Sequence, residues 1–417
     1  MLKKTPILPF ILITSLFLMW GLANNMTDTL LSAFKRIMSM SDFQTTFVQY
    51  AFYGAYFCLA IPAAILIKKY TYKTGILIGL GLFIGGSLLF YPASKTMVYG
   101  HFLAALFILA GGLSLLETSA NPYIIAMGPE ETGTQRLNLA QSFNPIGSII
   151  GVLLSKLFIL SKLNVAGEAE RASMSPEQLQ AIQSEELTGV MGPYVGVALF
   201  LVLIWLLIFF NKMPTASDEN SSLNFGEAWG RLIKKRSYVW SVITMFFYIG
   251  AQIGTWSFTI RYVMKELNVN EEQASSYYLA ALVLFLLSRF VCTYLMRFIA
   301  PHRLLASLAV LALILTGTVM ASGGYVGVYA LVGISGCMSL MFPTIYGLGL
   351  RGVGQDTKIG GSGLIMAILG GAVLTGVQGQ ISDATQSINT AFVMPLFCFG
   401  VVVYFALREA KVAPQNM

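Results

Sequence analysis

Two carboxylates lie inside long apolar stretches of this chain, and their positions suggest chemistry more strongly than any other residues. Asp28 follows the apolar run of residues 6–26, and Glu117 lies within the run 102–127. An acid at the centre of a membrane-spanning helix costs about 2.5–3.5 kcal/mol on insertion scales. Such a cost is typical of a functional group, and coupling to a proton or another cation is the usual function.

The chemistry of a buried acid fits coupled transport across a membrane. A low dielectric favours the neutral form of a carboxyl group, so Asp28 or Glu117 can take up a proton near neutral pH and release it elsewhere. The membrane potential contributes about 2.3 kcal/mol per charge per 100 mV. Carboxylate and amide oxygens can also hold Na⁺, so these residue types leave proton and sodium coupling both open.

Amide side chains accompany the two acids. Asn24 and Asn25 lie four and three residues before Asp28, so they can share a helix face with it. Further amides inside apolar runs are Asn121, Asn138, Gln141, Asn144 and Gln252. Amides donate and accept hydrogen bonds, as sugar hydroxyls require, and Trp20 and Trp256 offer apolar faces for a pyranose ring. A single amide is more often interhelical packing, worth about 0.6 kcal/mol, but this set indicates a ligand cavity.

The remaining polar candidates favour structural interpretations. Arg289 lies within an apolar run, where we interpret it as a snorkelling or interhelical structural cation rather than a transport residue. The two histidines, His101 and His302, lie near the ends of expected helices, which argues against a histidine proton relay. The sequence has no H-E-x-x-H motif, so an intramembrane enzyme is a poor interpretation. We expect no metal and no cofactor besides the coupling ion.

The elements that must position these residues are membrane helices. A mean hydropathy of +0.72 with 11% charged residues excludes an ordinary soluble domain, which carries roughly 25% charge. At about 20 residues per crossing, the 417 residues accommodate about twelve helices. The apolar runs that predict them are 7–33, 44–67, 74–93, 98–127, 137–161, 190–211, 238–263, 274–298, 303–321, 325–350, 359–382 and 387–407.

Charge placement predicts the orientation of these helices. The net charge of +7 does not indicate a nucleic-acid partner, because the basic residues gather on one side of a twelve-helix topology, as the positive-inside rule requires. Lys35 and Arg36 are an exception, and the loop 162–188 on the opposite side is acidic. Both termini are therefore expected in the cytoplasm. The basic residues on that side include Lys68, Lys69, Lys73, Arg136, Lys234, Lys235, Arg297, Arg303 and Arg351.

The chain also shows signs of internal duplication. A polar segment, 213–236, follows the sixth helix and separates a six-helix half at 1–212 from a second at 237–417. Residues recur at an offset of about 221, and a second offset of about 228 places Trp256 opposite Asp28. The residues that recur at the first offset are Pro122, Gly128 and Gly133, with Pro343, Gly349 and Gly354. Parallel six-helix repeats with a midplane site are typical of secondary transporters.

Local signals refine three segments. Ser175 and Pro176, followed by Gln178, predict a capped helix start and a short helix outside the membrane. The spacing of Gly147 and Gly151 predicts close packing between helices. Pro145 predicts a kink in the fifth helix beside the expected site.

Several longer motifs resemble a known family. The chain is similar over essentially its whole length to bacterial fucose–proton symporters of the major facilitator superfamily. The resemblance implies an all-α fold of twelve transmembrane helices in two six-helix pseudo-repeats, alternating access, essential acids at Asp28 and Glu117, and sugar-site residues at Asn25, Gln141 and Asn144. The motifs are WGLANNMTDTLL (20–31), LETSANP (116–122), GPEETGTQRLNLAQSFN (128–144), MSPEQL (174–179), GAQIGTWSFTIRY (250–262), FPTI (342–345) and GQDTK (354–358).

We therefore expect a proton-coupled monosaccharide symporter of the bacterial inner membrane, acting as a monomer on L-fucose. Thr27 and Pro145 differ from the residues common in the family and leave the sugar open, so glucose or galactose and Na⁺ coupling remain alternatives. A transporter-derived sugar sensor is a further alternative, although the short tail after residue 407 offers no signalling extension. The expected partners are the sugar and the lipid bilayer, with no nucleic acid.

Overall fold

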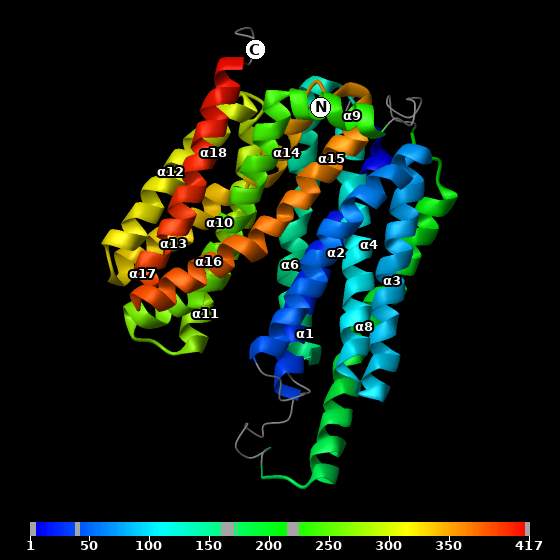
Figure 1. The fold of residues 1–417 in the computed structure, drawn as a ribbon, viewed down its shortest axis with the longest axis vertical. Coiled ribbons are helices and arrows are strands. Elements are labelled where there is room, and N and C mark those ends of the chain that lie inside the picture. Colours follow the sequence, from blue (N-terminus) through cyan, green and yellow to red (C-terminus); the bar gives the residue numbers. More distant parts are fainter. Residues whose placement is uncertain (1–5, 38–41, 160–170, 172, 215–224, 413–417) are drawn as a thin grey trace. The chain divides into compact units, whose positions relative to one another are not determined.

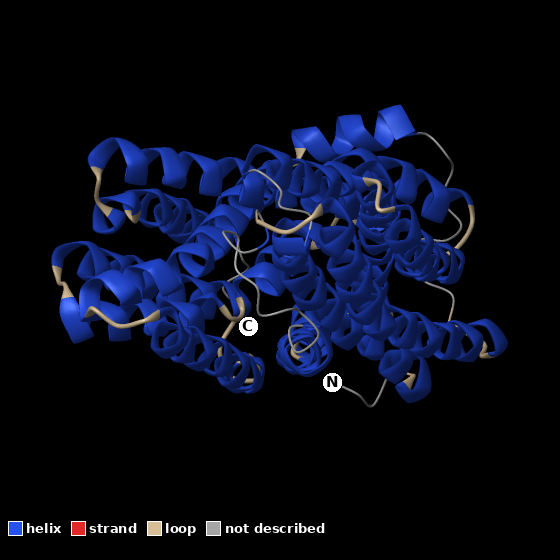
Figure 2. Cartoon of the chain, turned by 90° about the horizontal axis from the view of Figure 1, so that it is seen from below, coloured by secondary structure: helices blue, strands red, loops and turns tan. Residues whose placement is uncertain are grey.

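The chain forms helices joined by short loops. The computed structural model describes residues 6–37, 42–159, 171, 173–214 and 225–412, and within these ranges Figure 2 shows helices and loops only. Eleven helices in the described part are long and apolar enough to cross a membrane, and α1 (Ile7–Ile37) has a shorter apolar stretch at Ile7–Ala23. These helices correspond to the twelve predicted runs and confirm an all-α polytopic protein.

The first of two compact units, here the N unit, consists of Pro6–Ala120 and Phe143–Thr215. In this unit α1 packs on α6, and α3 packs on α8 (Figure 1). Its elements are α1, α2 (Asp42–Lys69), α3 (Tyr72–Thr96), most of α4 (Tyr99–Ala126), α6 (Phe143–Leu154), a π-helical turn (Ser155–Ile159) and α8 (Pro176–Phe210).

The second unit, here the C unit, contains Asn121–Ser142 and Ala216–Met417. In this unit α10 packs on α16, and α12 packs on α18. Its elements are the end of α4, a 3-10 turn (Glu130–Thr132), α5 (Gly133–Gln141), α9 (Phe225–Lys234), α10 (Arg236–Leu267), α11 (Glu271–Leu295), α12 (Pro301–Ala321), α13 (Gly324–Met338), α14 (Met341–Leu350), a 3-10 turn (Gly354–Asp356), α15 (Thr357–Met366), a 3-10 turn (Ala367–Leu369), α16 (Gly370–Thr385), α17 (Ile388–Ala391) and α18 (Val393–Val412).

The helix pairs repeat between the two halves of the sequence. The first predicted span packs on the fifth (α1 on α6) and the third on the sixth (α3 on α8). The seventh span packs on the eleventh (α10 on α16) and the ninth on the twelfth (α12 on α18). Each pair in the first half thus has a counterpart six spans later, which agrees with the predicted pseudo-repeats.

Glycines allow the first pair in each half to pack closely. A Cβ atom on Gly147 of α6 would overlap the backbone carbonyl of Leu18, and one on Gly151 would lie 2.6 Å from the carbonyl oxygen of Leu22. In the C unit, a Cβ atom on Gly370 would overlap the carbonyl of Phe246 on α10. The close packing predicted from Gly147 and Gly151 is therefore confirmed.

Three predicted runs contain short interruptions of the α-helix, although each still forms one candidate membrane span. The run 137–161 breaks at Ser142, between α5 and α6. The run 325–350 breaks between α13 and α14, and the run 359–382 contains the turn Ala367–Leu369. The first break lies three residues before Pro145, which cannot donate to the carbonyl four residues earlier. The kink expected from Pro145 stays a prediction.

Helix α8 departs from the sequence prediction in the opposite way. Its start has the predicted capping box, with Ser175 and Gln178 each satisfying a backbone N–H of the other. The helix is not a separate short one, however, because it continues without a break for 35 residues to Phe210 (Figure 1). At 1.5 Å per residue it is about 52 Å long, well beyond the roughly 30 Å hydrocarbon core.

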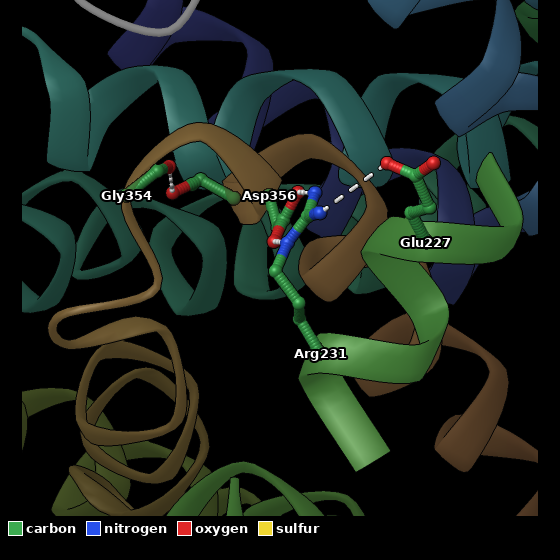
Figure 3. A network of polar contacts seen from close by, with 5 residues as sticks. Glu227, Arg231, Gly354 and Asp356 are labelled. Carbon is green, nitrogen blue, oxygen red and sulfur yellow. Dashed lines mark hydrogen bonds and ion pairs between the residues drawn. The ribbon is translucent and has the colours of Figure 1, made fainter. Parts of the chain in front are cut away.

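Helix α9 lies within the predicted linker. It is hydrogen-bonded to the turn Gly354–Asp356, at the start of the eleventh span. Arg231 donates two hydrogen bonds to the Asp356 carboxylate, from Nε and Nη2, each at 2.8 Å (Figure 3). The hydrogen bonds to Asp356 raise the pKa of Arg231. Glu227, one turn earlier, lies 3.8 Å from the same guanidinium. The division of the chain at 213–236 stays a prediction, because the compact units follow different boundaries and residues 215–224 lie outside the described ranges.

We expect Gly147→Val to destabilise the N unit, because the new side chain would push α6 away from α1. Overpacking of this kind costs typically about 1–3 kcal/mol, so the apparent melting temperature in detergent should fall by several degrees. The matched control is Gly85→Val on α3, where an added Cβ would meet nothing within 4 Å. Equal melting temperatures for the two variants would contradict the close approach of α1 and α6.

Candidate functional site

Glu117 is the centre of a buried polar cluster in the N unit, defined here as the acid cluster of Trp20, Tyr56 and Glu117. Glu117 is only 6% exposed to solvent. The Tyr56 hydroxyl donates a 3.0 Å hydrogen bond to Oε1 of Glu117. The Trp20 side chain in turn hydrogen-bonds to Tyr56. Helices α1, α2 and α4 therefore each contribute one side chain to this cluster.

Two predicted amide residues, Asn25 of α1 and Asn144 of α6, contact Gly21 in the same unit. Asn25 is half buried, and its Nδ2 donates to the Gly21 carbonyl at 3.1 Å. Asn144, in the first turn of α6, is also half buried, and its backbone carbonyl approaches Gly21 so closely that a Cβ there would overlap it. The two remaining predicted residues of α1, Asn24 and Asp28, have side chains outside the described part of the structure.

Gln141 lies in the C unit, at the end of α5, and is held by a partner amide. Its Nε2 donates to Oδ1 of Asn121 at 2.8 Å, and both residues are buried. This hydrogen bond holds the Nε2 end of the Gln141 amide against Asn121. Among the described residues its Oε1 has no hydrogen-bond donor and is available to a ligand.

Trp256 and Gln252 lie one turn apart on α10 of the C unit, and both are half buried. The Trp256 Nε1 donates to Oγ of Ser335 at 3.0 Å. The Trp256 ring also packs edge-on against Phe285, with centroids 5.1 Å apart. Phe285 lies under the guanidinium of Arg289 at 4.7 Å, so an aromatic and cationic series extends from Trp256 into α11.

Arg289, the last member of this series, donates hydrogen bonds to two backbone carbonyls that have a proline, and so no N–H donor, four residues later. Its Nη1 donates to the carbonyl of Gln141 at 3.0 Å, and its Nε donates to the carbonyl of Ser339 at 2.5 Å. Gln141 lies four residues before Pro145, and Ser339 lies four residues before Pro343. Neither proline has an N–H that could donate to these carbonyls. Arg289 is therefore a structural cation, as interpreted from the sequence.

Arg136, which the charge pattern assigned to the cytoplasmic side, is fully buried rather than solvated. It donates hydrogen bonds to the carbonyls of Ile124, Ile125 and Pro129 and to the Thr132 hydroxyl. The first two carbonyls belong to the last turn of α4, where a cation also faces the negative end of the helix dipole. Arg136 thus closes the turn between α4 and α5.

The acid cluster contains one residue that the sequence interpretation missed. Tyr56 lies in an apolar run with tyrosines at three-residue spacing, Tyr50 and Tyr53. That spacing indicates a tyrosine-rich helix face, but it does not identify the ring that meets Glu117 on another helix. The described residues contain no group of three His, Cys, Asp or Glu side chains that could hold a metal ion.

Comparison with known proteins places the chain among transporters. The family model of the Major Facilitator Superfamily matches residues 10–377. The L-fucose-proton symporter of Escherichia coli K12 is 41% identical over 416 residues, which is 99% of this chain and 95% of that protein. The glucose/galactose transporter of Brucella abortus (strain 9-941) is 31% identical, over 96% of this chain and 93% of that protein. The crystal structure of the transporter FucP in the outward conformation matches with a TM-score of 0.92 at 41% identity, covering 97% and 99% of the two chains.

We expect Arg289→Lys to lower the stability of the C unit by about 2–3 kcal/mol, because one ammonium group cannot replace both directed hydrogen bonds. Thermal unfolding in detergent measures this loss. The change should cost less in a Pro343→Ala background, where the substituted alanine restores an N–H donor for the Ser339 carbonyl. Arg261→Lys, at an exposed position on α10, is the control. Equal costs of Arg289→Lys in both backgrounds would refute the role of Arg289 at the Ser339 carbonyl.

Proposed function

We propose, since the chain belongs to the Major Facilitator Superfamily, that it is a symporter that imports L-fucose together with protons. The observation that carries the proposal is a buried acid, Glu117, bound by Tyr56 within an apolar bundle. The full-length identity of 41% to the L-fucose-proton symporter of E. coli supports the choice of sugar and ion. The relatives it matches are transporters, which agrees with the expectation that the chain is not an enzyme.

Glu117 and Asp28 are the proposed proton-coupling residues. An ionised Glu117 accepts the hydrogen bond of the Tyr56 hydroxyl, whereas a protonated one carries its own donor. Gain of a proton therefore changes the hydrogen bonding of Glu117 with α2 and reduces the cost of burying it. Such a change can bias alternating access between proton-loaded and empty states. We place Asp28 in the same role because it lies on α1 with Trp20.

Sugar recognition is assigned to the amide and aromatic side chains. Gln141, held by Asn121, presents its Oε1 to a sugar hydroxyl. Asn144 is half buried at the start of α6 and can supply both a donor and an acceptor. The further proposed sugar-binding residues are Asn24, Asn25, Trp20, Gln252 and Trp256.

We further propose a multi-pass protein of the bacterial inner membrane with both termini in the cytoplasm, acting as a monomer. The basic residues in the last turns of α2 and α9, and Arg297 just after α11, support this orientation through the positive-inside rule. The coupling ion is the only cofactor in this proposal. The functional division is the predicted one, with six-helix bundles at 1–212 and 237–417 and a cytoplasmic linker at 213–236.

A second candidate substrate is glucose or galactose. The identity of 31% to the glucose/galactose transporter of B. abortus over nearly the whole chain supports it. Uptake of labelled L-fucose, D-glucose and D-galactose into proteoliposomes distinguishes the two, with pH and Na⁺ gradients imposed separately. Uptake of D-glucose without L-fucose, or uptake driven by Na⁺ alone, would replace the proposed substrate or coupling ion.

We expect Asp28→Asn and Glu117→Gln each to abolish accumulation of L-fucose driven by an inward proton gradient. Either amide removes the group that binds and releases the proton, so uptake should fall to the level of liposomes without protein. Exchange of labelled for unlabelled sugar measures whether Glu117→Gln still binds and moves sugar. Glu272→Gln, at an exposed position on α11, is the control. Normal accumulation in both acid variants would rule out the proposed coupling.

We expect Gln141→Ala and Asn144→Ala each to weaken L-fucose binding by about 3–10-fold, because a neutral hydrogen bond contributes about 0.5–1.5 kcal/mol. Calorimetric titration of the purified protein in detergent measures the dissociation constant. Gln180→Ala, on the exposed start of α8, controls for nonspecific effects of removing an amide. Unchanged affinity in both site variants would move the sugar site elsewhere.

A further inference from the structure

A cavity of about 300 Å³ lies at one end of the C unit, and none of the proposed sugar or proton-coupling residues lines it. Most of its lining comes from three segments, the turn after α4, the connection from α11 to α12, and the end of α14, and Ala410 of α18 completes it. On the proposed orientation this end of the unit faces the cytoplasm. The cavity is large enough for a small organic ligand.

Positive charge predominates around this cavity. Arg297, Arg303 and Arg351 are among the residues that line it, and all three are exposed to solvent. Two acids, Glu130 and Glu131, also line it, but both have other interactions. Glu130 accepts a 2.7 Å hydrogen bond from the backbone N–H of Gly352, and Glu131 interacts electrostatically with Arg136.

A buried histidine also lines the cavity. His302 is only 7% exposed and lines the cavity. It makes no hydrogen bond to another described residue, although Arg303 and Arg351 are close enough to act on it electrostatically. Buried polar side chains normally have a hydrogen-bond partner. An anion bound between the arginines would give the imidazole an acceptor for its ring N–H.

The backbone adds a further attraction for anions at the same place. Helix α12 begins at Pro301, next to His302, and Ala300 provides no side-chain cap for its first turn. The positive end of the dipole of this 21-residue helix therefore opens beside the arginines. Guanidinium groups bind phosphate oxygens through paired N–H donors, which a chloride ion cannot use equally.

We propose that this cavity binds a phosphomonoester, held by Arg297, Arg303, Arg351 and His302 at the start of α12. The phosphate group can belong to a small soluble molecule, such as a hexose phosphate, or to the headgroup of phosphatidic acid. The site lies on the α4–α5 turn and the α11–α12 connection. Its lining includes neither Gln141 nor any residue of the acid cluster, so it uses a different set of side chains from the proposed sugar site.

Calorimetric titration of the purified full-length protein with glucose 6-phosphate and with inorganic phosphate tests the soluble source. We expect saturable binding that weakens at least tenfold in Arg303→Gln and in Arg351→Gln. Both residues are exposed, so their replacement should leave the fold intact, and unchanged thermal unfolding without ligand verifies this. Lys234→Gln removes one positive charge from α9 outside the cavity and should leave the affinity unchanged.

Nanodiscs that contain phosphatidic acid or only phosphatidylcholine test the lipid source, with the melting temperature as the readout. Stabilisation by phosphatidic acid that is lost in Arg303→Gln, without binding of the soluble phosphates, would assign the site to the lipid headgroup. Absence of binding in both tests, or an equal loss of affinity in Lys234→Gln, would overturn the proposal. Neither readout depends on sugar uptake, so failure of this proposal is distinguishable from failure of fucose transport.

Discussion

A backbone carbonyl that loses its N–H partner inside a membrane must find another donor within the protein, because lipid provides none. Pro145 and Pro343 each impose this constraint on the carbonyl four residues earlier. Arg289 satisfies both, with hydrogen bonds to Gln141 and Ser339. One side chain on α11 thereby fixes the end of α5 and the break between α13 and α14. The position of the Gln141 amide depends on this arrangement.

The same constraint accounts for other buried polar groups in the C unit. The Tyr248 hydroxyl donates to the carbonyl of Met338 at 3.1 Å, immediately before the same break. Arg136 binds the last carbonyls of α4. Helix ends supply unpaired carbonyls and the negative end of a dipole, so a buried guanidinium can be satisfied there without an acidic partner. The broken helix leaves a carbonyl without a donor, and the buried arginine needs an acceptor. Each therefore satisfies the hydrogen bond that the other would lack.

Sequence patterns predicted the spans and the capping box at Ser175, because each depends on residues close together in the chain. They also identified Glu117, since an acid in an apolar run is unusual wherever the helix lies. The pairing of Glu117 with Tyr56 could not be predicted, because it depends on which faces of α2 and α4 meet. The grouping of Asn121–Ser142 with the C unit was equally inaccessible, since it arises from contacts such as that between Asn138 and Thr344, 206 positions apart.

The two halves of the sequence carry different chemistry on a repeated scaffold. A group that carries a proton must exist in both charged and neutral forms during the cycle, and a carboxyl group such as Glu117 can do so. A guanidinium remains protonated in proteins, and Arg289 is held in that form by two carbonyls. The predicted offset between the repeats places Trp256, which cannot titrate, opposite Asp28. The helix pairs therefore occur twice, whereas the proposed proton chemistry is confined to the first half of the sequence and the second half contributes the fixed charge of Arg289 and the aromatic surface of Trp256.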